Sequence, residues 1–241
     1  MTDGPFLDLY RSDLQAFYAL WIVPALFLGW LLVTPAARSA ARARDPEARF
    51  VYRYCVVFAI EAIIDPFATG PLVQALGLQQ GLVGTAVVVA FVLMGDFRVL
   101  LLLFRLAAPG STLASSARDA ALWTAFVPLV AFGTRSVLEE ALGSLPPQTI
   151  WLLYEIGFLG LALWLRQRGL PAWIAPEEPR RLSRLQAIAS YVALYYGLWA
   201  LADALLLTLD LDVAWALRIV PNQLYYSLYL PFVYFQLSSR R

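Results

Sequence analysis

The sequence predicts an all-α, polytopic membrane protein in which residues 1–241 form a single domain, a bundle of seven transmembrane helices. Three observations favour this fold class. The chain is 61% hydrophobic and 15% charged, whereas soluble domains are about 45–50% apolar and about 25% charged. The apolar residues form runs of about 20, the length that a helix needs to cross a bilayer. The arginines gather in alternate loops, which predicts an N-terminus outside the cytoplasm and a C-terminus inside it.

We expect the seven helices at about 14–34, 51–70, 82–106, 120–137, 149–166, 186–208 and 213–236. The first run is preceded by an acidic segment and no small-residue cleavage site follows it, so it is a span and not a signal peptide. The fourth run is interrupted by Pro128 and Gly133, and the seventh contains Pro221, which weakens a helix where it occurs. The loops between the runs are too short to hold a second folded domain.

The loop arginines set the predicted orientation. Fourteen of them fall on one side of the membrane: Arg38, Arg42, Arg44, Arg49, Arg53, Arg105, Arg118, Arg166, Arg168, Arg180, Arg181, Arg184, Arg240 and Arg241. The other side has Arg11 and the acidic residues Glu139, Glu140, Asp210 and Asp212. Since the arginine-rich side is cytoplasmic in membrane proteins, we expect a multi-pass protein of the cell (inner or plasma) membrane.

The residues that are missing exclude several classes of function. All 18 basic residues are arginine, and the chain has no histidine and no lysine. Without lysine it cannot form a Schiff base with retinal or pyridoxal phosphate, and without histidine it lacks the usual axial ligand of haem or chlorophyll. The single Cys55 allows no internal disulfide and no four-cysteine metal site. We therefore expect no cofactor and no metal site, and a net charge of +1 argues against a nucleic-acid partner.

Apart from Arg53, Arg105 and Arg166 at the helix ends, eight charged residues fall inside the predicted helices, where each costs about 2.5–3.5 kcal/mol to insert. Five are acids and three are arginines, so one or two carboxyls must be protonated or share a bound cation. Because lipid cannot satisfy these groups, we expect them to face a polar cavity inside the bundle. The candidate residues for binding a substrate or ion are Glu61, Asp65, Asp96, Glu155, Asp203, Arg218, Asn222 and Gln223. We identify no catalytic residue.

Depth along each helix predicts how these charges pair. Arg218 or Arg135 is expected to pair with Asp203 or Asp65, which lie in the same outer layer. Glu61 and Glu155 have no basic partner at their predicted depth near the midplane. Arg98 is closest in sequence to Asp96, although residues two apart point to different faces of a helix.

The predicted topology is similar to that of microbial rhodopsins and of sugar and vitamin carriers with a three-plus-one-plus-three bundle. Residues 45–49, Asp-Pro-Glu-Ala-Arg, and the pair Leu198-Trp199 resemble segments of a light-driven pump. The seventh span, however, lacks the lysine that holds retinal. Pro221-Asn222-Gln223 resembles the helix breaks of sugar carriers, without a second copy in the chain. No functional residue is carried over from either family.

Three functions fit these observations. The first is a transporter or channel-like protein that passes a proton, a cation or a small polar solute through a cavity lined by carboxyls and arginines. The second is a non-catalytic subunit or scaffold of a larger complex, whose polar residues fix helix packing. The third is a membrane-embedded enzyme acting on a lipid or isoprenoid, which we favour least because no nucleophile–base pair is present. The expected partners are the lipid bilayer and either another membrane protein or a second copy of the chain.

Overall fold

The helices account for most of the chain. The computed structural model describes residues 4–42, 44–78, 81–108 and 110–238, and it is 88% helical with no strand among these residues. The α-helices are α1 (Pro5–Arg11), α2 (Ala19–Val33), α3 (Pro35–Ala41), α4 (Pro46–Phe67), α5 (Val73–Ala75), α6 (Leu82–Ala107), α7 (Leu113–Leu142), α8 (Thr149–Trp164), α9 (Leu170–Trp173), α10 (Pro179–Leu209), α11 (Val213–Asn222) and α12 (Tyr229–Ser238). Four π-helical segments join some of them: η1 (Leu14–Tyr18), η2 (Ala68–Leu72), η3 (Leu165–Gly169) and η4 (Gln223–Leu228).

Among the described residues, six helical stretches are long and apolar enough to cross a membrane, which makes this a multi-pass membrane protein. They are Leu14–Val33, Pro46–Ala75, Leu82–Ala107, Leu113–Leu142, Thr149–Trp173 and Pro179–Leu209, and they overlap the first six predicted runs. The segment predicted as the seventh span is also helical, as α11, η4 and α12 in succession. It contains the polar residues Arg218, Asn222 and Gln223.

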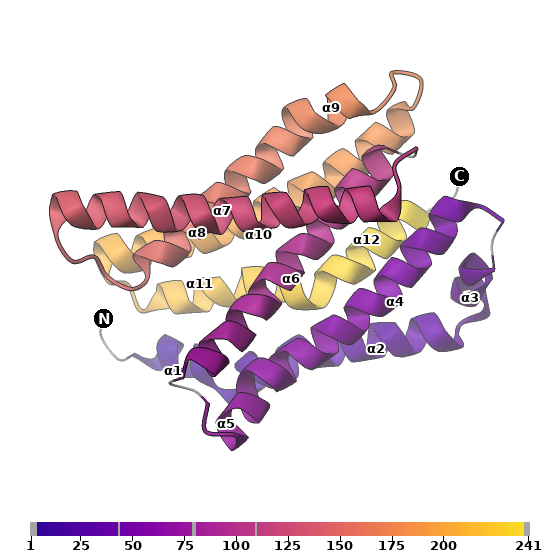
Figure 1. Ribbon diagram of the computed structural model, residues 1–241. Helices are drawn as coiled ribbons and strands as arrows, with labels where there is room; N and C mark the ends of the chain where they lie inside the picture. The colour runs from indigo at the N-terminus through magenta and orange to yellow at the C-terminus, as the bar shows by residue number, and fades with distance from the viewer. Residues whose placement is uncertain (1–3, 43, 79–80, 109, 239–241) are drawn as a thin grey trace. The chain divides into compact units, whose positions relative to one another are not determined.

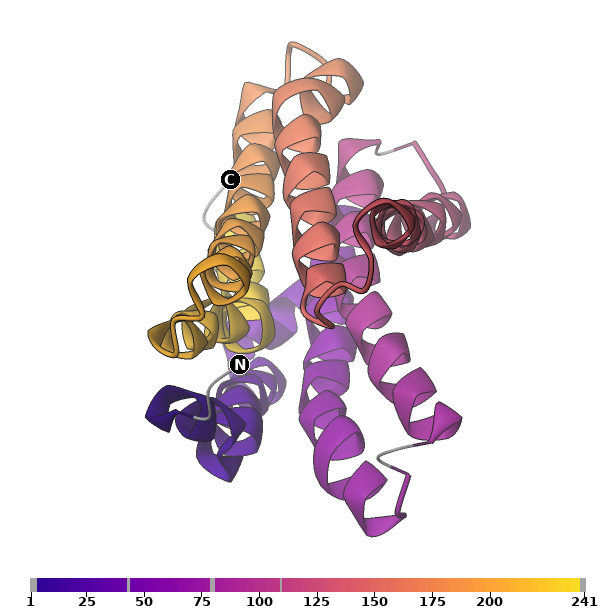
Figure 2. The same cartoon turned by 90° about the vertical axis from the view of Figure 1, so that its left-hand side faces the viewer.

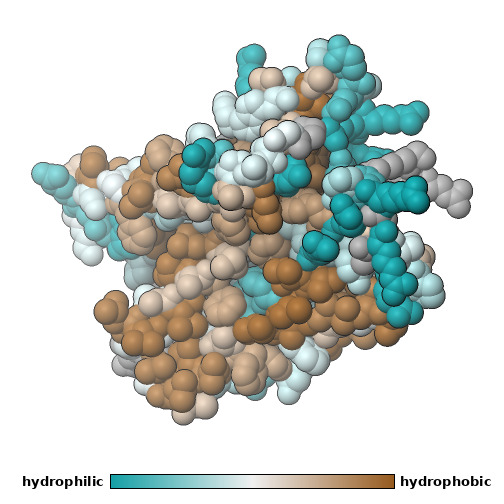
Figure 3. All heavy atoms as spheres, turned by 45° about the vertical axis from the view of Figure 1, so that its right-hand side comes forward, coloured by the Kyte–Doolittle hydropathy of each residue, from teal (hydrophilic) through white to brown (hydrophobic). Residues whose placement is uncertain are grey.

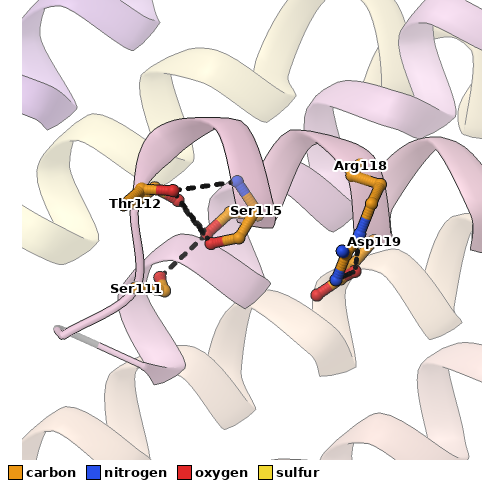
Figure 4. Close-up of polar contacts among 6 residues, drawn as sticks. Ser111, Thr112, Ser115, Arg118 and Asp119 are labelled. Atoms are coloured by element: carbon orange, nitrogen blue, oxygen red, sulfur yellow. Dashed lines mark hydrogen bonds and ion pairs between the residues drawn. The ribbon is translucent and has the colours of Figure 1, made fainter.

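Several helices begin earlier than their apolar runs because polar residues cap them in the loops. The α4 helix starts at Pro46, where the Asp45 side chain accepts a hydrogen bond from the Glu47 amide (2.9 Å). At the start of α7, the Thr112 hydroxyl accepts a hydrogen bond from the Ser115 amide (3.1 Å; Figure 4). Such caps satisfy amides that the first helical turn leaves without a partner. They lie outside the apolar runs, so hydropathy does not locate them.

The chain forms two compact units. Unit 1 contains residues 1–11 and 99–221, and unit 2 contains residues 12–98 and 222–241. In unit 1, α8 packs against α7 and α10, and α8 and α10 run side by side in both ribbon views (Figures 1 and 2). In unit 2, α2 packs against α4 and η4, and α12 packs against α4. Each unit therefore has its own helix packing and its own set of buried charges.

The outer surface of the helices is apolar. Large side chains such as Leu26 on α2 and Leu129 on α7 are 70% and 69% exposed, and apolar residues cover broad areas of the face drawn in Figure 3. In contrast, Arg98 is 1% exposed and Asp203 is fully buried. Apolar groups outside and charged groups inside are the arrangement expected when lipid surrounds the helices.

Candidate arginine centres

Unit 2 contains a buried arginine that other helices surround. Arg98, on α6, donates from Nη1 to the Glu61 carboxylate on α4 (3.1 Å) and from Nη2 to the Tyr225 carbonyl in η4 (2.7 Å). Its guanidinium carbon lies 4.9 Å from the centre of the Tyr225 ring and 5.3 Å from that of Tyr229. The Tyr54 hydroxyl donates to the Arg98 carbonyl (2.9 Å). We call Arg98, Glu61, Tyr54, Tyr225 and Tyr229 the Arg98 centre.

The Tyr225 carbonyl that accepts from Arg98 belongs to a π-helical segment. In an α-helix each carbonyl is taken by the amide four residues later, and a π-bulge disrupts that ladder. The bulge follows directly after Pro221, which itself lacks an amide proton. Gly95, on α6, makes room for the same tyrosine, because a Cβ at that position would overlap the Tyr225 hydroxyl. That hydroxyl donates to the Val92 carbonyl (3.2 Å).

Two further carboxyls of unit 2 are buried. Asp65 lies one helical turn after Glu61 on α4, and its Oδ1 accepts from the Thr69 hydroxyl (3.3 Å). Asp96, on α6, is also buried. Beyond Glu47 in the first turn of α4, the described helices of unit 2 thus hold three acids and one buried guanidinium. Two of these groups, Glu61 and Arg98, neutralise each other.

Unit 1 contains a second arginine centre. Arg218, on α11, forms an ion pair with Asp203 on α10, and its Nη1 lies 3.5 Å from Oε1 of Glu155 on α8. Gln148, at the start of α8, donates from Nε2 to the other oxygen of Asp203 (2.6 Å). Asp203 is fully buried and Glu155 is 3% exposed. We call Arg218, Asp203, Glu155 and Gln148 the Arg218 centre.

The N-terminal helix packs beside the Arg218 centre. The guanidinium carbon of Arg218 lies 5.9 Å from the centre of the Tyr10 ring on α1 and 5.8 Å from that of Trp215 on α11. The two rings lie 5.1 Å apart. Helix α1 is held in place by Asp212, whose carboxylate oxygens accept from the Phe6 and Leu7 amides (3.0 and 3.2 Å). Two aromatic rings therefore cover one side of the buried guanidinium.

The charge balance of the Arg218 centre leaves one carboxyl over. Asp203 has the ion pair with Arg218 at one oxygen and the hydrogen bond from Gln148 at the other, so a positive charge and a donor both favour its anionic form. Glu155 has one oxygen at the longer distance from Arg218, and its Oε2 is buried with no hydrogen-bond partner among the described residues. A buried anionic oxygen without a partner is costly. Glu155 is therefore the group of this centre on which a proton or a cation can reside.

The structure corrects two of the predicted pairings. Glu61 has a basic partner, Arg98, and Glu155 lies beside Arg218, so the expectation that both acids lack one is wrong. Arg98 donates to Glu61 on the neighbouring helix α4 (3.1 Å). Depth counted from approximate helix ends does not show which side chains meet across helices. The predicted pair of Arg218 with Asp203 is present, whereas Arg135 pairs with Glu139 on its own helix (2.8 Å).

The eight candidate site residues divide between the two units. Glu155, Asp203 and Arg218 meet in unit 1, and the remaining five lie in unit 2: Glu61, Asp65, Asp96, Asn222 and Gln223. Asn222 and Gln223 mark the junction of α11 with η4, where Ser227 donates to the Gln223 side-chain oxygen (2.9 Å). The prediction missed Gln148 and Tyr10. Gln148 stands immediately before an apolar run, and its polarity next to the run that holds Glu155 is the signal that could have found it.

Neither centre resembles a metal site. Within the described ranges, no group of three or more His, Cys, Asp or Glu residues is placed to hold a metal ion. Both centres can keep buried charges neutralised, and the Arg218 centre can also exchange a proton or a small cation at its surplus carboxyl, Glu155. Comparisons of the chain with family models, with curated proteins and with solved structures found no match.

Proposed function

We propose that the protein passes a proton, a cation or a small polar solute across the cell (inner or plasma) membrane through a path lined by carboxyls and arginines. The observation that carries this proposal is the surplus carboxyl of the Arg218 centre, Glu155, whose Oε2 has no hydrogen-bond partner among the described residues. The residues proposed to bind the solute or ion are the eight candidates of the sequence analysis: Glu61, Asp65, Asp96, Glu155, Asp203, Arg218, Asn222 and Gln223.

The Arg218 centre contains one fixed ion pair and one carboxyl that can exchange a proton or a cation. Arg218 and Asp203 form an ion pair that Gln148 supports, so this pair can stay intact while Glu155 changes its charge. With Glu155 ionised, the centre is one negative charge in excess and attracts a proton or a cation. With Glu155 neutral, the charges balance. A buried group that has two such states is typical of proton- and cation-coupled sites in membranes.

Loss of Glu155 as a titratable group is expected to abolish pH-linked flux. Purified protein would be reconstituted into vesicles that contain a pH-sensitive dye, and a proton gradient would be imposed. We expect Glu155→Gln to reduce proton flux to the level of protein-free vesicles, because glutamine retains the shape and polarity of the acid but cannot carry its charge. Glu139→Gln, which neutralises a half-exposed carboxyl on α7, is the matched control and should keep the wild-type flux. Unchanged flux in Glu155→Gln would remove this residue from the proposed path.

We further propose that the segment from α11 through α12 is a seventh span, with the N-terminus outside and the C-terminus in the cytoplasm. Ser144→Cys and Asp210→Cys should then react with an impermeant thiol reagent added from the non-cytoplasmic side, and Ser39→Cys and Ser183→Cys should not. All four positions are exposed, and the native Cys55 is buried, which limits background labelling. The reverse labelling pattern would overturn the orientation.

A scaffold or non-catalytic subunit is the second candidate, and the Arg98 centre favours it. The guanidinium of Arg98 is engaged by a carboxylate, a backbone carbonyl and two tyrosine rings. This is a network that can hold three helical segments together without moving any solute. Wild-type protein that carries no proton flux under any imposed gradient would support this second function over transport.

A further inference from the structure

The junction of α8 with α9 in unit 1 carries two arginines beside two tryptophans. Arg166 and Arg168 lie in η3, between Trp164 at the end of α8 and Trp173 at the end of α9. We propose that these four residues bind the phosphate of an anionic lipid headgroup. This interaction does not depend on whether the protein transports a solute.

The length of α8 places the arginines at the level of the headgroups. Helix α8 starts at Thr149, and at about 1.5 Å per residue Arg166 and Arg168 lie about 26–29 Å further along. The hydrocarbon core of a bilayer is about 30 Å thick. A helix that crosses the membrane from Thr149 therefore delivers these guanidinium groups to the opposite interface.

Both arginines are available for an anion. Their side chains are exposed, and within the part of the chain that the structure describes neither forms an ion pair with a carboxylate. Two other arginines of unit 1 differ in this respect, since Arg181 pairs with Glu178 (2.5 Å) and Arg118 pairs with Asp119 (2.8 Å; Figure 4). Residues two apart start from different faces of a helix, so the two guanidinium groups reach the headgroup level from both sides of η3, and two unneutralised positive charges there attract a negatively charged headgroup more strongly than a zwitterionic one.

The backbone under the arginines is held in place. The Gln186 side chain on α10 donates from Nε2 to the Arg166 carbonyl (3.0 Å). Gly169 closes the π-helical turn, and a Cβ there would lie 3.2 Å from the ring of Trp164 and 3.2 Å from that of Trp173. Glycine therefore allows both rings to pack closely against the turn.

The tryptophans form an aromatic cluster beside the charges. The Trp164 and Trp173 rings lie 5.8 Å apart, and they also contact Trp123 (5.8 Å) and Phe104 (5.6 Å), respectively. Trp164 and Trp173 remain 42% and 41% exposed. Half-exposed tryptophans are typical of the headgroup level, where their rings contact acyl chains and their N–H groups face polar atoms.

The chemistry of the four residues fits a phosphodiester. A guanidinium group can donate two parallel hydrogen bonds to phosphate oxygens, and the tryptophan rings cover the adjoining glycerol and upper acyl carbons. An anionic lipid such as phosphatidylglycerol has both the phosphate oxygens and the adjoining carbons in one molecule. Free phosphate has only the oxygens.

Binding would be measured with full-length protein in nanodiscs of phosphatidylcholine that contain increasing fractions of phosphatidylglycerol brominated near the headgroup. Bromine quenches tryptophan fluorescence on contact, so quenching reports bound lipid. We expect the wild type to prefer the brominated anionic lipid over brominated phosphatidylcholine. The double variant Arg166→Gln/Arg168→Gln should lose this preference, on the order of tenfold.

The control variant is Arg38→Gln/Arg42→Gln, which removes two exposed arginines at α3 that have no tryptophan beside them in sequence. It should keep the preference. An equal loss in both double variants would overturn the site, because general surface charge would then explain the effect. The proposal also fails if the wild type shows no preference for the anionic lipid, or if millimolar inorganic phosphate displaces the lipid. Trp173→Leu should weaken the quenching although both arginines are intact. This variant tests the contribution of the tryptophan rings to lipid binding separately from that of the charges.

Discussion

Replacement of Arg218 by alanine is expected to destabilise the protein by about 3–5 kcal/mol. Asp203 is fully buried and Glu155 nearly so, and both would lose their only cationic partner among the described residues. A buried carboxylate left without a counter-charge must either stay ionised at high cost or take up a proton. The free energy of unfolding, measured by denaturant titration in detergent micelles, would report the change.

A second substitution should rescue much of that loss. Asp203→Asn in the Arg218→Ala background removes the stranded charge, and the asparagine oxygen can still accept from Gln148. Arg135→Ala is the matched control, because this arginine pairs with Glu139 at the helix surface, where such i, i+4 pairs contribute about 0.3–0.5 kcal/mol. If the Arg218 and Asp203 substitutions are merely additive, the ion pair does not hold this centre together.

Gly95→Ala is expected to cost about 1–3 kcal/mol through overpacking. The added methyl group would overlap the Tyr225 hydroxyl, so either α6 or η4 must shift. Tyr225 cannot move freely, because its carbonyl accepts from Arg98 and its ring faces the same guanidinium. The substitution should therefore also disturb the Arg98 centre, and the loss would appear as a lower midpoint of thermal unfolding.

Two comparisons isolate the cause of that loss. Gly133→Ala places a methyl group in the middle of α7, where no atom lies within 4 Å of it, so it should be neutral or stabilise the helix by up to about 1 kcal/mol. Adding Tyr225→Phe to Gly95→Ala removes the overlapping oxygen and should recover part of the stability. Equal effects of Gly95→Ala and Gly133→Ala would contradict the close approach of Tyr225 to α6.

Hydropathy predicted the helical class and the positions of the first six spans because burial in lipid leaves a long, continuous signal. It did not predict where α4, α7 and α10 begin, since their first turns contain Pro46, Ser115 and Arg180 and lie outside the apolar runs. Those starts depend on caps such as Asp45 and Thr112. A cap is a contact between one side chain and one amide, and it leaves no periodic pattern.

The charged residues of the two centres could be identified from the sequence because inserting a charge into a membrane costs free energy. The residues with which they pair could not be identified in this way. Glu61 and Arg98 are separated by 37 positions and Glu155 and Arg218 by 63, so helix packing decides whether they meet. The second acceptor for Arg98 is a backbone carbonyl within a π-helical segment. Every residue has a backbone carbonyl, so the residue type does not single this one out. Pro221 indicated a weakened helix, but not which nearby carbonyl would accept from a side chain on another helix.

The cap that Asp212 provides to α1 has a consequence for biosynthesis. The Phe6 and Leu7 amides leave the ribosome well before the carboxylate that they bind, which is about 200 residues further along the chain. At about 5–20 residues per second, translation takes roughly 10–40 s to reach it. During that time the N-terminal helix has neither its cap nor the hydrophobic surface of Leu206, Ala214 and Trp215 on which Leu7 packs. Helix α1 therefore reaches its final place only after the segment around Asp212 has been synthesised.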